Sequence, residues 1–124
     1  MNKLALVFIG GGIGAATRYG TTLLAGRWLG TGFPWGTLLV NLSGCFLIGI
    51  ILGLADKSNI LSPQTRLFLV TGFLGGLTTF SSYAQETIVA LRSSTYLALG
   101  NIVCNNLIGL ALVALGLMLT EHVL

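Results

Sequence analysis

The stretch "GFLGGLTTFSSY", residues 72–83, decides the fold because it interrupts a segment that is otherwise apolar enough to cross a membrane. Gly75 and Gly76 each weaken a helix by about 0.8–1 kcal/mol relative to alanine. The threonines that follow can bond their own backbone instead of continuing the helix. The pattern predicts a helix break near residues 75–79. Within a bilayer, such a break persists only where protein buries it or where it lines a water-filled cavity.

The composition is that of a membrane protein. Of the 124 residues, 54% are hydrophobic and only 7% are charged, whereas a typical soluble domain carries about 25% charged residues. A transmembrane helix needs about 20 mostly apolar residues. We therefore predict an all-α membrane protein with four transmembrane helices, the third broken near its middle. The uncharged runs place these helices at about 3–26, 33–55, 65–91 and 95–120.

The start of the chain has two interpretations. A basic residue followed by an apolar run also fits a cleaved signal peptide. We favour a retained first helix because the apolar pattern continues through glycines to Arg18 and Tyr19 instead of ending in a polar domain. Short connections are expected near 27–32, 56–64 and 92–94, which leaves a single transmembrane domain, residues 1–124.

The basic residues give little guidance on orientation. Lys3, Lys57 and Arg66 would lie on one side of the membrane, and Arg27 and Arg92 on the other. Lysine and arginine normally concentrate in cytoplasmic loops, and three against two is hardly a bias. Either another feature sets the orientation, or the chain inserts both ways and pairs head to foot. The second interpretation has weight because 124 residues can hardly enclose a transport path alone.

Asparagines supply most of the neutral polar groups within the expected helices. Asn41 lies in "GTLLVNLSGCFLIG", residues 36–49, and Asn101, Asn105 and Asn106 lie in "GNIVCNNLIG", residues 100–109. Asn101 and Asn105 are four residues apart and share one helix face. Any one of them could simply hold helices together, but polar groups at this depth are functional candidates. Together they favour a polar path.

The residues around the break suit two kinds of ion. Free backbone carbonyls at an unwound membrane helix favour a cation. After the break, Phe80 and Tyr83 share a face, and aromatic rings have a positive edge that can contact an anion. Hydroxyl and amide groups can donate hydrogen bonds to the same ion. The set favours a small, strongly hydrogen-bonding anion, with core packing of the two rings as the plain alternative. Arg18 either extends to the interface or supports an entrance or helix end.

Three stretches resemble the motifs of the Fluc/CrcB fluoride channels. "GFLGGLTTFSSY" resembles the third-helix signature, "GGGIGAATRY" at 10–19 the first-helix motif, and "GTLLVNLSGCFLIG" at 36–49 the second. The resemblance implies an antiparallel, dual-topology homodimer of four-helix subunits in a bacterial plasma or inner membrane. It implies a channel that lets fluoride leave the cytoplasm passively and not an enzyme.

The resemblance also implies roles for particular residues. The ring edges of Phe80 and Tyr83 would line the pore, although the family usually has a second phenylalanine where this chain has Tyr83. That departure leaves open a paralogous partner in place of a second copy. The other implied path positions are Asn41, Thr79, Ser81, Asn101 and Asn105.

A structural sodium ion is implied at the centre of the dimer, and no organic cofactor. The backbone carbonyls of Gly75 and Thr78 from both subunits would hold the sodium. The resemblance thus assigns a cation to the carbonyls freed by the break.

Two other functions compete with the fluoride channel. A small multidrug-resistance type exporter is also a four-helix dual-topology dimer, but it is proton-coupled, transports cationic compounds and needs a membrane-embedded acid. Here the only candidate acid is Glu86, late in the third helix. A non-transporting assembly subunit would explain the closely spaced glycines, such as Gly10 and Gly14, but would leave the asparagines and the break without a role.

Overall fold

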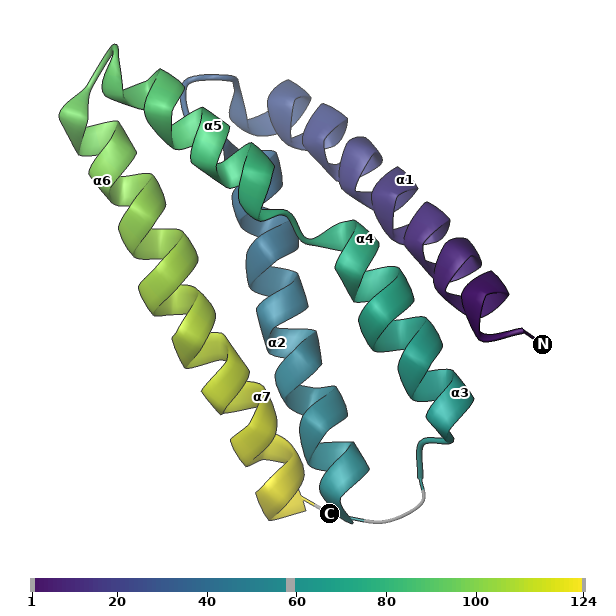
Figure 1. Ribbon diagram of the computed structural model, residues 1–124. Helices are drawn as coiled ribbons and strands as arrows, with labels where there is room; N and C mark the ends of the chain where they lie inside the picture. The colour runs from purple at the N-terminus through teal and green to yellow at the C-terminus, as the bar shows by residue number, and fades with distance from the viewer. Residues whose placement is uncertain (1, 58–59, 124) are drawn as a thin grey trace.

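The computed structural model describes residues 2–57 and 60–123, and within these ranges the regular elements are all helical. They form four rods (Figure 1). The first two are α1 (Lys3–Leu29) and α2 (Trp35–Lys57). The third rod consists of α3 (Pro63–Arg66), η1 (Leu67–Leu74), α4 (Gly75–Leu77) and α5 (Phe80–Leu91). The fourth consists of α6 (Thr95–Val103), η2 (Cys104–Ile108) and α7 (Gly109–Val123).

These bounds lie within a few residues of the four predicted helices at each end. The segments η1 and η2 are π-helical, so their turns are wider than those of an α-helix. Positions 1, 58, 59 and 124, which the expected domain and the expected connection at 56–64 include, lie outside the described residues.

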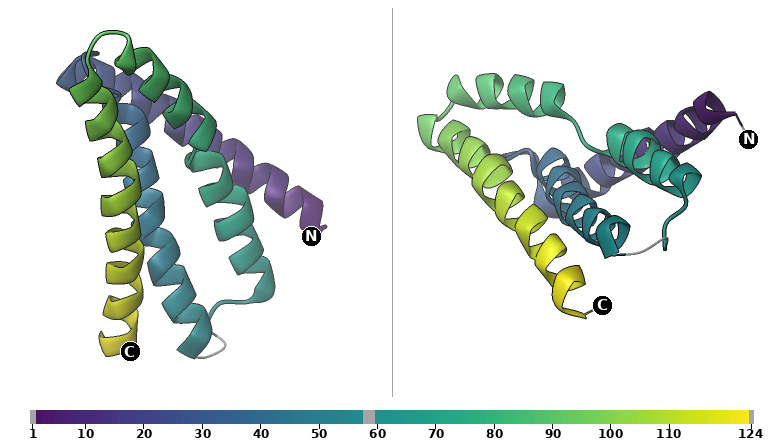
Figure 2. Two further views of the ribbon diagram at one scale, coloured as in Figure 1. Left: turned by 60° about the vertical axis from the view of Figure 1, so that its left-hand side comes forward. Right: turned by 60° about the horizontal axis from the view of Figure 1, so that its bottom comes forward.

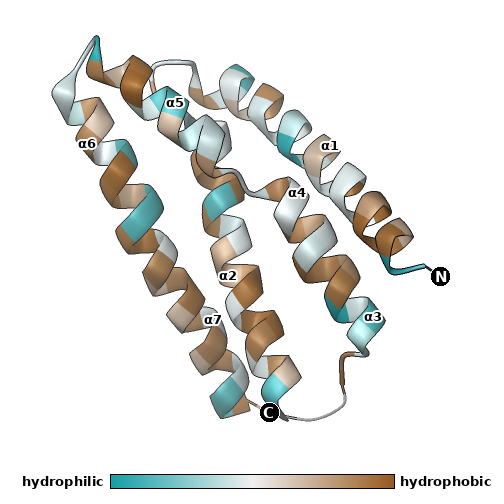
Figure 3. Ribbon diagram, in the orientation of Figure 1, coloured by the Kyte–Doolittle hydropathy of each residue, from teal (hydrophilic) through white to brown (hydrophobic). Residues whose placement is uncertain are grey.

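Three stretches are long and apolar enough to cross a membrane: Trp35–Asp56, Pro63–Leu91 and Thr95–Val123. The protein is a multi-pass membrane protein. The first helix, α1, is long enough to span but is less apolar, because it contains Arg18, several threonines and many glycines. Figure 3 shows this contrast, with paler and more hydrophilic ribbon through the middle of α1 than through α7.

Side-chain caps and a short turn define where the helices begin and end. Ser62 precedes Pro63 and accepts a hydrogen bond from the Thr65 amide at 3.1 Å, which starts the third rod. Gly30 follows α1 with φ 82°, a conformation that favours glycine. A tight turn at residues 92–94, where the sequence predicted a short connection, joins α5 to α6, so these helices are antiparallel neighbours.

Glycines let the rods approach backbone to backbone. A Cβ atom added at Gly14 would overlap the Phe73 carbonyl oxygen of η1, and one at Gly10 would lie 2.7 Å from the Phe68 carbonyl oxygen. A second seam joins α2 to α7, where Gly49 meets the backbone of Val113. Such close approach is the main way in which helices associate in lipid. The glycine seams therefore hold α1 on the third rod and α7 on α2.

The third rod breaks at two residues. Thr78 (φ −83°, ψ 155°) and Thr79 (φ −153°, ψ 124°) are extended, and α5 is displaced sideways from α4 (Figure 2). The break lies within the predicted range, but the predicted reason was incomplete, because Gly75 and Gly76 remain helical. A Cβ atom at Gly76 would overlap the Gly11 carbonyl oxygen of α1. Gly76 thus serves packing, and the extended backbone belongs to the threonines.

Asn41 of α2 satisfies the backbone at this break. Its Nδ2 donates to the Thr79 carbonyl at 3.1 Å, and its Oδ1 accepts from the Thr79 amide at 2.9 Å. One side-chain amide thereby replaces both of the partners that a continuous helix would have given Thr79. Unpaired backbone groups in a bilayer cost several kcal/mol each. The break in the third rod therefore requires the two hydrogen bonds between Asn41 and Thr79.

We predict that Gly14→Ala destabilises the protein and that Gly12→Ala does not. An added Cβ at Gly14 meets fixed backbone of the third rod, whereas one at Gly12 meets nothing within 4 Å. Overpacking of this kind costs about 1–3 kcal/mol, while alanine on an open helix surface is favourable. Thermal unfolding in detergent measures the difference. Equal unfolding temperatures for the two variants would show that the α1 seam does not stabilise the fold.

Candidate functional site

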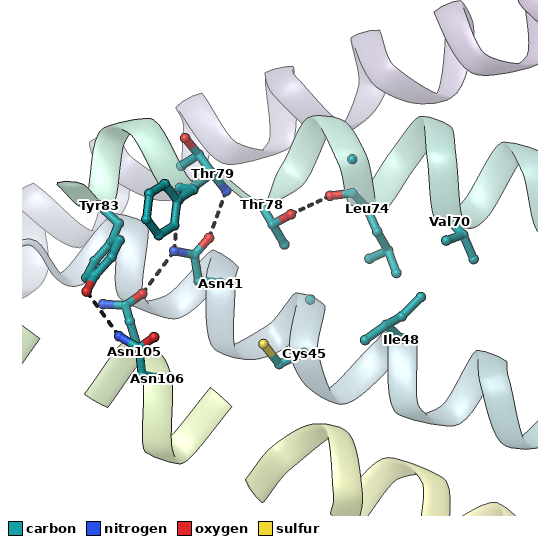
Figure 4. A pocket seen from close by; sticks show the side chains of 13 residues that line it. Asn41, Cys45, Ile48, Val70, Leu74, Thr78, Thr79, Tyr83, Asn105 and Asn106 are labelled. Carbon is teal, nitrogen blue, oxygen red and sulfur yellow. Dashed lines mark hydrogen bonds between the residues drawn. The ribbon is translucent and has the colours of Figure 1, made fainter. Parts of the chain in front are cut away.

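An open-sided cavity of about 410 Å³ lies beside the break, between α2, the third rod and η2. Figure 4 shows its polar end, where side chains from three rods meet, and its apolar end toward Ile48 and Val70. The predicted site residues that line it are Asn41, Gly75, Thr78, Thr79, Phe80, Tyr83 and Asn105. The fold therefore collects most of the predicted residues in one place.

The asparagines form a continuous chain of hydrogen bonds. Asn41 Nδ2 donates to Asn105 Oδ1 at 2.9 Å, and Asn105 Nδ2 donates to Asn101 Oδ1 at 2.9 Å. Asn101 is fully buried and donates to the Thr87 hydroxyl at 2.9 Å. Thr87 in turn donates to the Tyr83 carbonyl at 2.8 Å. The chain connects α2, η2, α6 and α5, so it joins the helices as well as lining the cavity.

Two aromatic rings line the cavity beside this polar region. The Phe80 and Tyr83 centroids are 5.4 Å apart, and the planes cross at 62° in an edge-to-face arrangement. They lie on one face of α5, as their spacing predicted. Phe80 is 77% exposed in the single chain, which is a large apolar area for a residue beside a polar cluster. A ring in this position can present its positive edge to an anion in the cavity.

Three predicted residues do not line the cavity: Asn101, which is buried and joins the amide chain, and also Ser81 and Arg18. Ser81 is exposed and contacts the Thr79 hydroxyl at 3.3 Å. Arg18 lies on α1, half-buried, and is not among the residues around the cavity. The structure does not bring the Ser81 and Arg18 side chains to the site.

The break frees the two carbonyls that the resemblance assigned to a cation. The helical donor for the Gly75 carbonyl would be the Thr79 amide, which donates instead to Asn41. The helical donor for the Thr78 carbonyl would be the Ser82 amide, which donates instead to Thr79 Oγ1 at 3.2 Å. Gly75 is also exposed in the single chain. These two oxygens fit the requirements of a hard cation such as sodium, which prefers oxygen ligands.

Glu86 belongs to a second cavity, of about 450 Å³, between the ends of α1, α2, α5 and α6. Its Oε1 accepts a hydrogen bond from the Thr37 hydroxyl at 2.8 Å. Its Oε2 is buried and, within the described residues, has no hydrogen-bonding partner. The acid that the exporter alternative requires therefore lies on the third rod, bonded to α2, and not on the first helix.

Asn106 is a site residue that the predicted set did not include. It lines the cavity and donates to the Tyr83 hydroxyl at 3.0 Å (Figure 4). The resemblance implied Asn105 as a path position and did not name its neighbour Asn106, which the sequence had only grouped with the other membrane asparagines. Both asparagines lie in η2, whose wider turn reduces the angle between successive side chains. The consecutive asparagines were the available signal.

Comparison with known proteins gives one family. The family described as "CrcB-like protein, Camphor Resistance (CrcB)" matches residues 5–117. A relative from Parabacteroides distasonis is 43% identical over 100% of this chain and 97% of its own length. One from Chlorobium phaeobacteroides is 51% identical over 81% of each chain, and one from Salinibacter ruber is 46% identical over 94% of this chain and 87% of its own.

All three relatives bear the name "Fluoride-specific ion channel FluC", which is the name of a transport protein and not of an enzyme. The matched region contains every residue of the cavity, the amide chain and the break. With that coverage, and with identities of this size over most of its length, the chain belongs to the CrcB family.

Proposed function

We propose that this protein is a fluoride-specific ion channel that lets fluoride leave the cytoplasm passively, down its electrochemical gradient. The observation that carries the proposal is the cavity at the break, where two aromatic ring edges adjoin a chain of amide and hydroxyl groups. Fluoride is small and accepts hydrogen bonds strongly, and among the described residues that line this cavity none carries a positive charge that would hold the ion too tightly. The names of the relatives support the same ion.

The proposed working unit is an antiparallel homodimer. Phe80 is exposed, the cavity is open on one side, and Gly75 is uncovered in a single chain. The uncovered Gly75 backbone and the polar end of the open cavity need a cover other than lipid, because lipid cannot bond to polar groups, and Phe80 lies on the same surface. A second copy inserted in the opposite orientation would supply that cover, and the nearly balanced basic residues permit both orientations.

A structural sodium ion is part of the proposal. The carbonyls of Gly75 and Thr78, whose helical donors are diverted, would hold it together with the same groups of the second copy. When bound, the ion supplies positive charge near the anion path without adding a titratable side chain. The chain's own contribution is the extended backbone at Thr78 and Thr79, fixed by Asn41.

Phe80→Ile is expected to abolish fluoride efflux from liposomes, down to the rate of protein-free vesicles, because it removes the ring edge but keeps an apolar side chain. Phe8→Ile is the matched control, since Phe8 on α1 is 81% exposed and lies outside the cavity. Fluoride and chloride electrodes measure efflux, and size-exclusion chromatography checks assembly. Full efflux in Phe80→Ile would remove Phe80 from the path. Proton-driven uptake of a cationic dye by the parent, without fluoride efflux, would favour the exporter instead.

Sodium is expected to raise the unfolding temperature of the purified protein, whereas potassium at equal ionic strength is not. A ligand that binds only the folded state stabilises that state. The stabilisation grows with the logarithm of the ligand concentration once this exceeds the dissociation constant. The measurement is thermal unfolding across a series of sodium-to-potassium ratios after exhaustive dialysis. An unfolding temperature that is the same at every ratio would contradict the sodium site while leaving the fluoride path untouched.

A further inference from the structure

The side chains around the cavity use nearly all of their hydrogen-bond donors on one another. Asn41 Nδ2 donates to Thr79 and Asn105, and Asn105 Nδ2 donates to the backbone and side-chain oxygens of Asn101. The Thr78 hydroxyl donates to the Leu74 carbonyl at 2.9 Å. The amides and the Thr78 hydroxyl are therefore committed to the protein, although they are the groups that would be expected to donate to an anion.

Tyr83 is the exception among these side chains. Within the described residues, the hydrogen bond of its hydroxyl is the one from Asn106 Nδ2, at 3.0 Å. In that bond the phenol oxygen accepts. A phenol has one proton to donate as well as lone pairs to accept, so its O–H remains available at the wall of the cavity.

The polarity of the Tyr83–Asn106 bond is fixed by a third group. The same Asn106 Nδ2 donates to the Ile102 carbonyl at 2.8 Å. A carbonyl can only accept, so the amide nitrogen and not the amide oxygen must face Ile102, which settles the amide orientation. Asn106 must then donate to Tyr83, and Tyr83 cannot donate back. The phenol proton is directed away from Asn106.

We infer that Tyr83 donates its hydroxyl proton in a hydrogen bond to the permeating anion, and that Asn106 positions the hydroxyl for this. The inference rests on the proposed function, because it names a ligand within the same path. Tyr83 would contact the anion and determine how strongly it binds, whereas Asn106 would act through Tyr83. Tyr83 would thus offer the anion a hydrogen-bond donor in addition to an aromatic ring edge.

The first test compares Tyr83→Phe with the parent in planar-bilayer or liposome recordings over a range of fluoride concentrations. The substitution keeps the ring and removes the donor. A hydrogen bond to a charged group corresponds to about a 10- to 100-fold change in affinity, so the half-saturating fluoride concentration should rise by about tenfold or more. Tyr96→Phe is the matched control, because Tyr96 is 87% exposed at the start of α6, away from the cavity.

The second test is a double-mutant cycle with Asn106→Leu, which removes the amide at similar size. Alone it should also raise the half-saturating concentration, and in a Tyr83→Phe background it should add nothing, because it acts through the absent hydroxyl. A merely structural role would lower the maximal flux and the unfolding temperature in both backgrounds. Additive effects of the two substitutions would overturn the positioning role.

The outcomes separate this inference from the function on which it rests. If the parent shows no fluoride-selective flux, both fail. If the parent conducts fluoride and Tyr83→Phe has the same half-saturating concentration, the channel stands and the donor role of Tyr83 is wrong. An increase confined to Tyr83→Phe and Asn106→Leu, without additivity and with assembly intact, supports the inference.

Discussion

The two hydrogen bonds between Asn41 and Thr79 are the interaction on which the rest of this structure depends. A bilayer offers no partner for free amide and carbonyl groups, so a transmembrane helix can unwind only where another part of the protein replaces those partners. Asn41 presents a donor and an acceptor in the arrangement of a peptide group. With Thr79 held in this way, the sideways step between α4 and α5 becomes stable, and the cavity, the exposed Phe80 and the freed carbonyls follow from that step.

The same asparagine begins the polar chain that continues through Asn105 and Asn101. These asparagines can therefore hold the helices together and line the polar path at the same time. The amides connect three helices, and because they bond one another they are already oriented before any ion arrives. Such preorganisation is what allows dipoles to stabilise charge without reorganising. It also limits how many donors are left for the ion, which makes the Tyr83 hydroxyl unusual on this wall.

The sequence was most informative where a residue type conflicted with its environment. Threonines, asparagines and paired glycines in an apolar segment indicated the break and the polar cluster, and the four helices followed from the length of the apolar runs. The sequence was less informative about the role of each individual residue. Gly76 was assigned to helix unwinding but packs against α1. The sequence could not separate these two roles, because a glycine is compatible with an unwound helix and with close helix packing. Asn106 was grouped with the other membrane asparagines but was not assigned to the path, and its place on the cavity wall depends on a π-helical turn that the sequence did not predict. Ser81 and Arg18 share sequence neighbourhoods with the site, yet the direction of a side chain depends on packing that a single sequence does not contain.

The distance along the chain between Asn41 and Thr79 has a consequence for biosynthesis. The ribosome makes α2 before it makes the third rod, so Asn41 is already available when the extended residues leave the tunnel. A chain with the opposite order would have to place an unwound segment in lipid with no partner in reach. The partner that the extended residues require in the folded protein is thus synthesised before they are. The order of residues along the chain suits the break, because the donor and acceptor of Asn41 precede the backbone groups that they satisfy.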